Sequence, residues 1–158
     1  MDKIILKNEE ETRVFGRLIG EMLFKNAVVC LNGDLGAGKT TLTKSIAKAL
    51  NINDDITSPT FNIVNEYDEG DLKLFHFDVY RIGCSEEMYD IGYEEYIYGD
   101  GVCIIEWSNL IEDILPDERL EIELSYDEEG RSAVVCAYGK KHKEILEKIQ
   151  KIDFEKSR

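Results

Sequence analysis

The chain of 158 residues is 43% hydrophobic and 33% charged, a composition typical of a folded globular protein, and its length suits one domain over residues 1–158. Its 33 acidic and 19 basic residues give a formal net charge of −14, which argues against a protein that grips a nucleic acid alone. The four cysteines include no C-x-x-C pair, which argues against a zinc site and against disulfides. No apolar stretch suits a signal peptide, and none reaches the ~20 residues of a membrane span. We therefore expect a cytoplasmic protein.

The first predicted elements form a helix followed by a strand–turn–helix unit. Residues 12–25 place apolar side chains at helical spacing behind three glutamates, which predicts an amphipathic helix. Residues 27–31 are a continuous apolar run, which predicts a strand buried on both faces of a parallel sheet. A glycine-rich turn and a helix over residues 39–50 follow. This order is typical of an α/β nucleotide-binding unit.

The glycine-rich turn carries the clearest motif of the chain. Residues 33–40 have the sequence GDLGAGKT and match the phosphate-binding loop pattern G-x-x-x-x-G-K-[ST], which arises by chance in roughly 1% of chains of this length. Glycines let backbone N–H groups surround a phosphate, and the positive end of the next helix faces it. We expect Lys39 to contact the β- and γ-phosphates, Thr40 to ligate Mg²⁺ and Thr41 to reach the α-phosphate. The predicted nucleotide site also includes the loop residues Gly36, Ala37 and Gly38.

The middle of the chain predicts a hairpin, a broken helix and a second buried strand. Residues 61–67 and 72–80 flank a turn-forming cluster, which indicates a hairpin. Residues 84–98 have a helical pattern that is interrupted near Gly92. Residues 102–105 are another apolar run and predict a second strand of the parallel core.

The end of the chain predicts a second hairpin and a closing helix. Residues 120–126 and 131–138 flank another turn-forming cluster. Residues 140–158 predict an amphipathic helix with one apolar stripe, and its seven Lys or Arg against four Asp or Glu are interpreted as a solvated outer face. The predicted fold is an α/β P-loop NTPase domain. Its mixed sheet has a parallel core and antiparallel hairpins, with helices on both faces.

Two acidic residues end predicted strands, where open α/β sheets place catalytic and metal-binding groups. Glu106 directly follows the apolar run 102–105, as the Mg²⁺-binding acid of P-loop ATPases does, and Asp78 lies near the end of the strand at 72–80. Asp78 is then the better candidate for orienting the attacking water or holding a metal-bound water. With 33 acidic residues in the chain, a helix cap or a surface charge is the alternative for either acid.

Three positions near these strands are candidates for contacts with the γ-phosphate. Ser58 and Thr60 belong to the segment SPTF, which stands where the switch of a P-loop protein enters and otherwise forms only a turn. Arg81 is a candidate cation for the transferred phosphate, with pairing to a surface carboxylate as the alternative.

Two further side chains lie next to the candidate acids in the sequence. His76 shares a strand face with Asp78, but a lone strand histidine is more often a hydrogen-bonded packing residue than a base. Trp107 follows Glu106 and is placed at the mouth of the predicted site, with ordinary core packing as the alternative.

Several motifs occur together in an order that resembles the TsaE (YjeE) family. The segments are EET ending at Thr12, GDLGAGKTT from Gly33, SPTF from Ser58, HFDVYR from His76 and IEW from Ile105. The resemblance covers about residues 9–138. The phosphate-binding loop is shared by many families, whereas H-x-D-x-Y-R and I-E-W in this order are more specific. Ser108 departs from the family, which commonly has proline after Glu-Trp.

The resemblance implies an ATPase that uses Mg²⁺ and associates with the TsaB–TsaD complex, in which TsaD transfers the threonylcarbamoyl group to an adenosine of certain tRNAs. Such a protein reaches tRNA indirectly, through its partners, which agrees with the acidic charge. The resemblance implies Mg²⁺ ligation by Thr40 and Glu106 and a catalytic role for Asp78 beside Lys39. It also implies nucleotide contacts from Glu9, Thr12 and Arg131, and switch or partner-coupled roles for Ser58, Thr60, Tyr80, Arg81 and Trp107.

Three other functions compete with this interpretation. A small-molecule kinase on this fold usually has an arginine-rich lid, but residues 83–100 are acidic and contain no arginine. A GTPase carries an N/T-K-x-D segment after a strand, and none occurs here. A nucleotide-gated assembly subunit with little turnover uses the same residues as an ATPase, so the sequence leaves it open. We expect slow hydrolysis by the isolated chain and stimulation by partner proteins.

Overall fold

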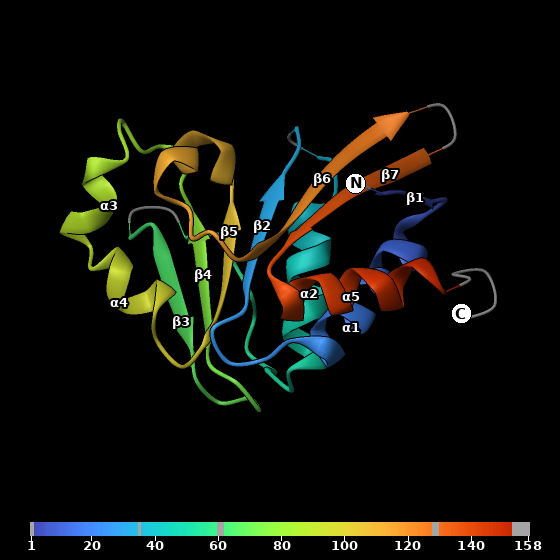
Figure 1. Cartoon of the computed structure of the whole chain (residues 1–158), viewed down its shortest axis with the longest axis horizontal. Coiled ribbons are helices and arrows are strands. Elements are labelled where there is room, and N and C mark those ends of the chain that lie inside the picture. The colour runs from blue at the N-terminus through green and yellow to red at the C-terminus, as the bar shows by residue number, and fades with distance from the viewer. Residues whose placement is uncertain (1, 35, 60–61, 128–129, 153–158) are drawn as a thin grey trace.

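The computed structural model describes residues 2–34, 36–59, 62–127 and 130–152. In these residues the strands form one sheet with the order β1-β7-β6-β2-β5-β4-β3 (Figure 1). The strands are β1 (Asp2–Leu6), β2 (Val28–Asn32), β3 (Val64–Tyr67), β4 (Leu74–Asp78), β5 (Val102–Glu106), β6 (Arg119–Asp127) and β7 (Gly130–Tyr138).

The centre of the sheet is parallel and its two sides are antiparallel. β5 pairs in parallel with β4 and β2, and β2 pairs in parallel with β6. β3 pairs antiparallel with β4, and β7 pairs antiparallel with β6 and β1. Every residue of β5 is buried, because helices cover it on both sides, which explains the apolar run over residues 102–105 that precedes Glu106. The predicted mixed sheet with a parallel core and two hairpins is confirmed.

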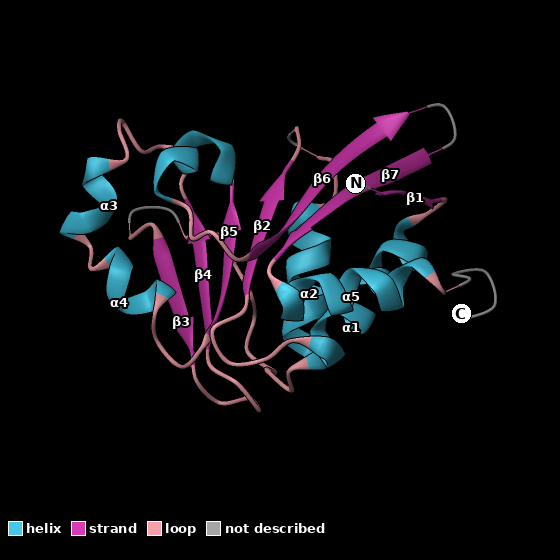
Figure 2. Cartoon of the chain, in the orientation of Figure 1, coloured by secondary structure: helices cyan, strands magenta, loops and turns pink. Residues whose placement is uncertain are grey.

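Helices cover both faces of the sheet (Figure 2). They are α1 (Glu9–Met22), α2 (Lys39–Ala49), α3 (Glu86–Asp90), α4 (Tyr93–Ile97), α5 (Lys140–Gln150) and the 3-10 helix η1 (Ser108–Ile114). α1, α2 and α5 share a buried cluster with Leu31 and Ile104, whereas α3, α4 and η1 share another with Cys30 and Cys103. Alternate side chains of β2 and β5 therefore enter two cores. None of the helices in the described ranges is long and apolar enough to cross a membrane.

The first elements differ from the prediction at their edges. α1 begins at Glu9, before the expected start at Thr12, because the Asn8 side chain caps it by accepting a hydrogen bond from the Glu11 backbone N–H (2.9 Å). The glutamates of the first turn favour this start through the helix dipole. β1 was not predicted. It is a short edge strand that pairs with β7, and its five residues alone give little periodic signal.

Two corrections concern the second half of the chain. η1 follows β5 directly and was not expected from the sequence. α5 ends at Gln150, so Ile152 of the predicted apolar stripe lies beyond the helix, although it still packs against the same core. Residues 153–158 of the predicted closing helix lie outside the described residues.

α1 and α2 pack so closely that Gly16 leaves no space for a methyl group. A Cβ at Gly16 would lie 2.6 Å from the Cβ of Ser45 and 3.1 Å from the carbonyl oxygen of Leu42. Gly16→Ala is therefore expected to lower the free energy of unfolding by about 1–3 kcal/mol, although alanine favours a helix over glycine by about 1 kcal/mol. Urea unfolding of G16A, S45G and the double variant tests this. Ser45→Gly removes the closest atom, so the double variant should be more stable than the sum of the two single changes in the free energy of unfolding predicts. Single changes that simply add up would contradict the steric explanation.

His142 links the stability of the fold to pH. Its Nε2 accepts a hydrogen bond from the backbone N–H of Val28 (3.2 Å), and burial lowers the pKa of His142 despite the opposing influence of Glu118 and the Tyr138 carbonyl. Because the folded protein binds this proton less well than the unfolded chain, the contribution is complete above the unfolded pKa of ~6.5 and is lost as the pH falls below it. We expect the free energy of unfolding to fall on acidification more steeply in the wild type than in His142→Gln. The glutamine amide oxygen accepts the same bond without titrating. Chemical denaturation at several pH values measures how the free energy of unfolding depends on pH, and an equal dependence in both proteins would contradict this assignment.

Candidate active site

The phosphate-binding loop connects the end of β2 to the start of α2. Gly33 has a φ of 142°, and a Cβ at this position would clash with the carbonyl oxygen of Leu124 in β6. Gly38 has a φ of 107° and directly precedes α2. The backbone thus turns at two positions where side chains are disfavoured, as a nest of N–H groups around an anion requires. Ala37 is buried in the core, and Leu35 lies outside the described residues.

Lys39 is held inside the loop by backbone carbonyls and by an aromatic ring. Its ammonium donates to the carbonyl oxygens of Gly33 and of Asp34, the latter at 3.1 Å. It also lies 4.2 Å from the ring centroid of Trp107. Burial lowers the pKa of Lys39, although Glu106 and other nearby carboxylates act in the opposite direction. An anionic ligand that enters the loop must therefore draw the ammonium away from these contacts.

The two predicted acids meet at the ends of neighbouring strands. Asp78 on β4 and Glu106 on β5 are opposite each other in the parallel ladder. Glu106 is only 3% exposed, and its Oε2 lies 2.5 Å from Nε2 of His76, which is 1% exposed. Asp78 is less buried, and its Oδ1 accepts a hydrogen bond from the Tyr80 backbone N–H (3.0 Å). Burial raises the pKa of Asp78 despite that bond, and the Glu106 charge raises it further.

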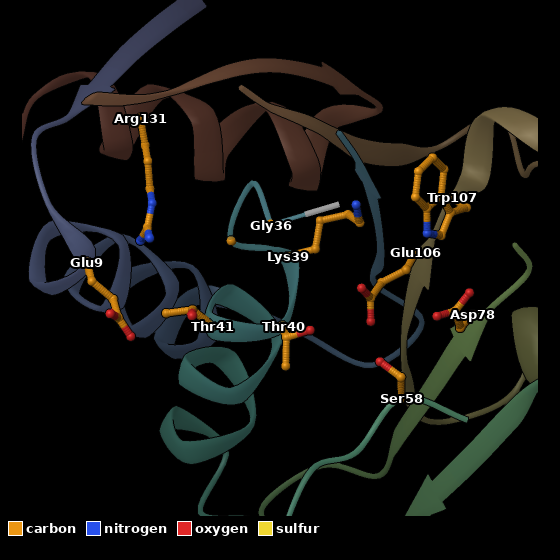
Figure 3. A pocket seen from close by; sticks show the side chains of 11 residues that line it. Glu9, Gly36, Lys39, Thr40, Thr41, Ser58, Asp78, Glu106, Trp107 and Arg131 are labelled. Carbon is orange, nitrogen blue, oxygen red and sulfur yellow. The ribbon is translucent and has the colours of Figure 1, made fainter. Parts of the chain in front are cut away.

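A single cavity of about 280 Å³ brings the loop and the strand ends together (Figure 3). This volume lies near the lower end of the range for ligand sites, ~300–1,000 Å³, and suits a phosphate chain. The lining holds three carboxylates and two cations, so a polyphosphate needs an added positive charge to bind here. The lining residues are Glu9, Gly36, Gly38, Lys39, Thr40, Thr41, Ser58, Asp78, Glu106, Trp107 and Arg131.

One wall of the cavity comes from α1 and from the start of β7. Glu9 and Arg131 line it, as Figure 3 shows on the side of the loop away from Asp78. Thr12 lies just outside the lining. It is buried, and its hydroxyl donates to the Asn8 carbonyl (3.4 Å) within α1.

The Arg131 guanidinium is oriented by Tyr126, a residue that the sequence analysis did not single out. Arg131 donates to the Tyr126 hydroxyl (2.9 Å), while its Nη1 is buried without a hydrogen-bond partner among the described residues. That nitrogen lies 3.9 Å from the position of a Cβ on Gly38. A free N–H beside the loop is suited to an anion. Tyr126 stands opposite Arg131 in the β6–β7 register, so pairing the predicted hairpin residue by residue could have found it.

The predicted switch residues lie at different places around the cavity. Ser58 and Trp107 line it, and the Trp107 backbone adopts a φ of 63°. The Trp107 ring packs against Tyr80, with 4.8 Å between the ring centroids. Tyr80 and Arg81 are exposed and do not belong to the lining. Thr60 lies outside the described residues.

The oxygen atoms at the cavity fit Mg²⁺ if phosphate supplies the remaining ligands. The Thr40 hydroxyl and the Glu106 carboxylate both border the cavity, and Figure 3 shows the carboxylate between Thr40 and Asp78. Mg²⁺ is usually held by one or two protein oxygens together with phosphate and water. No group of three or more His, Cys, Asp or Glu in the described ranges could hold a metal by itself. Phosphate and water would have to supply the other ligands of a metal at this cavity.

The family follows from comparison with known proteins. A family model described as threonylcarbamoyl adenosine biosynthesis protein TsaE matches residues 6–134. The chain belongs to the TsaE family. It is similar to the tRNA threonylcarbamoyladenosine biosynthesis protein TsaE of Bacillus subtilis, with 42% identity over 147 residues that cover 92% of each protein. It is also similar to the protein of the same name from Treponema pallidum, with 38% identity over 135 residues, 85% of this chain and 99% of that protein.

Structural comparison agrees with this membership in the TsaE family. The chain matches the crystal structure of Bacillus subtilis YdiB with a TM-score of 0.76 and 37% identity, over 94% of this chain and 92% of that one. The fold predicted from the sequence and the resemblance to the TsaE family are thus confirmed. The segment matched by the TsaE model contains all the residues that line the cavity. TsaE proteins serve threonylcarbamoyladenosine biosynthesis on tRNA.

Proposed function

We propose that this protein binds ATP with Mg²⁺ and hydrolyses it in the cytoplasm, in support of threonylcarbamoyladenosine synthesis on tRNA. The observation that carries the proposal is the cavity in which Lys39 and Thr40 meet Asp78 and Glu106. Phosphoryl transfer to water needs positioning and charge stabilisation more than covalent chemistry by the protein. These four side chains are of the types that supply both.

Each side chain has a separate task in the proposed reaction. Lys39 leaves the loop carbonyls and binds the β- and γ-phosphates. Thr40 and Glu106 hold Mg²⁺, which when bound neutralises charge on the phosphates. Asp78 orients the attacking water and accepts its proton, and the raised pKa of Asp78 makes it a better base than an exposed aspartate. Arg131 offers its free N–H to the nucleotide.

The partners in this proposal are TsaB and TsaD, and tRNA is reached through them. A chain with a net charge of −14 is poorly suited to holding tRNA alone. Transfer of the threonylcarbamoyl group is assigned to TsaD by the resemblance to the TsaE family. Hydrolysis by this chain then supports turnover of the complex.

The test is ATP hydrolysis with Mg²⁺ by the wild type and by Glu106→Ala, with and without purified TsaB and TsaD, alongside calorimetric nucleotide affinity. We expect slow hydrolysis by the wild type alone, stimulation by the partners, and loss of both in the variant. Unchanged hydrolysis on adding TsaB and TsaD would refute the coupling. Nucleotide binding without hydrolysis under any condition would instead identify a nucleotide-gated assembly subunit, and the catalytic roles of Asp78 and Glu106 would be withdrawn.

A further inference from the structure

His76 is a buried side chain in contact with the proposed metal-binding carboxylate of Glu106. It lies on β4 opposite Ile104, while Glu106 lies two residues further along β5, opposite Asp78. His76 and Glu106 thus occupy the same face of adjacent strands, and their side chains lean toward each other to bring Nε2 to 2.5 Å from Oε2. His76 is 1% exposed and Glu106 3% exposed, so water does not compete for this contact.

The two ring nitrogens of His76 have different surroundings, which determine the nitrogen that carries the proton. Nδ1 is buried without a hydrogen-bond partner in the described part of the chain, whereas Nε2 faces the carboxylate. A proton on Nδ1 alone would leave a buried donor unsatisfied and would direct the Nε2 lone pair at a carboxylate oxygen. Nε2 therefore carries the proton and donates it to Oε2 of Glu106.

This hydrogen bond constrains the carboxylate that borders the cavity. A buried carboxylate without a donor is costly, and one with a single donor is fixed in orientation by it. With Oε2 engaged by His76, rotation of the Glu106 carboxylate is restricted while the group still borders the cavity beside Thr40 (Figure 3). Partners that orient a metal ligand in this way typically change metal affinity by about 10- to 100-fold when they are removed.

We propose that His76 is a positioning residue, which holds Glu106 in the orientation that binds the Mg²⁺ of the metal–nucleotide complex. The inference rests on the proposed function, because the metal enters with the nucleotide. His76 does not touch the phosphates and takes no part in proton transfer to or from water. Its effect is on the metal-dependent part of nucleotide binding alone.

The test uses His76→Asn and His76→Gln, which carry the same amide on side chains of different length. The Gln amide extends to the region of Nε2 and keeps a donor to Oε2, whereas the Asn amide ends near the position of Nδ1 and does not reach it. Calorimetry on the full chain gives the Kd of the non-hydrolysable ATP analogue AMPPNP in EDTA and in excess Mg²⁺. The Kd in EDTA divided by the Kd in Mg²⁺ is the factor by which the metal strengthens nucleotide binding.

We expect His76→Asn to lower this ratio by about 10- to 100-fold, His76→Gln to keep it near wild type, and the Kd in EDTA to stay unchanged in both. If His76→Asn has the same ratio as the wild type, the inference is overturned and the proposed function still stands. An equal loss of affinity with and without Mg²⁺ would also overturn the inference, because it marks a packing role. A wild type that gains nothing from Mg²⁺ would overturn the proposed metal site and the inference with it.

Discussion

Replacing Asp78 with asparagine is expected to lower Mg²⁺-dependent ATP hydrolysis by about 10²- to 10⁴-fold and to leave nucleotide affinity close to that of the wild type. Asparagine keeps the Oδ1 that accepts the Tyr80 backbone N–H (3.0 Å), so the local backbone retains its support. It cannot take a proton from water, and it lacks the charge that would orient the attacking water. Affinity persists because the proposed phosphate contacts come from Lys39 and the loop.

Single-turnover hydrolysis and calorimetry separate these two effects. Asp90→Asn is the matched control, because Asp90 is exposed at the end of α3 and does not line the cavity. Burial raises the pKa of Asp78, so the wild-type rate should fall on acidification at a higher pH than the pKa of an exposed aspartate would give. Hydrolysis by D78N at the wild-type rate would remove Asp78 from the reaction.

The parts of the site that were predictable depend on residues that are adjacent in the sequence. A phosphate-binding loop needs consecutive residues with glycine at strained positions, and Gly33 and Gly38 do adopt positive φ values there. The acids were visible because each ends an apolar run, and parallel strands bring their carboxyl ends to one edge of the sheet. The sequence could thus place Asp78 and Glu106 at one edge of the sheet, where they are opposite each other in the ladder.

A contact between strands that are distant in the sequence was not predictable in the same way, because no turn gives its register, whereas the turn of a hairpin does. His76 meets Glu106 only because β4 pairs with β5 in one particular register. Tyr126 meets Arg131 only because the β6–β7 hairpin places them opposite each other. A shift of one residue would turn either side chain to the other face of the sheet. β1 escaped prediction for a related reason, since a short edge strand is stabilised by its partner rather than by its own pattern.

The two sides of the cavity differ in how firmly their charged groups are held. Glu106 is buried and bonded to a buried histidine, whereas Glu9 pairs with the half-exposed Arg13 on the outer surface of α1. An exposed pair of this kind is worth little, about 0–1 kcal/mol. The strand side therefore presents a fixed carboxylate, and the α1 side can rearrange around a ligand at small cost.

Lys39→Met is expected to weaken MgATP binding by about 10- to 100-fold, since a hydrogen bond to a charged group contributes about 1.5–3 kcal/mol and about 1.4 kcal/mol changes a constant tenfold. The effect is smaller than the bare attraction between an ammonium and a polyphosphate, because Lys39 must first leave the carbonyls of Gly33 and Asp34 and the ring of Trp107. Calorimetry measures the loss, with Lys44→Met as the control. Lys44 lies exposed on the same helix and does not line the cavity.

The same variant separates binding from folding. Burial lowers the pKa of Lys39, so the folded protein holds the charged ammonium less well than the unfolded chain does. Lys39→Met should therefore be at least as resistant to urea as the wild type while it loses nucleotide affinity. Trp107, the single tryptophan of the chain, lies 4.2 Å from the ammonium. Its emission should therefore change on MgATP addition in the wild type and not in Lys39→Met. A variant that loses both affinity and stability would show that the ammonium supports the empty loop, and the phosphate-binding role of Lys39 would then lack support from this experiment.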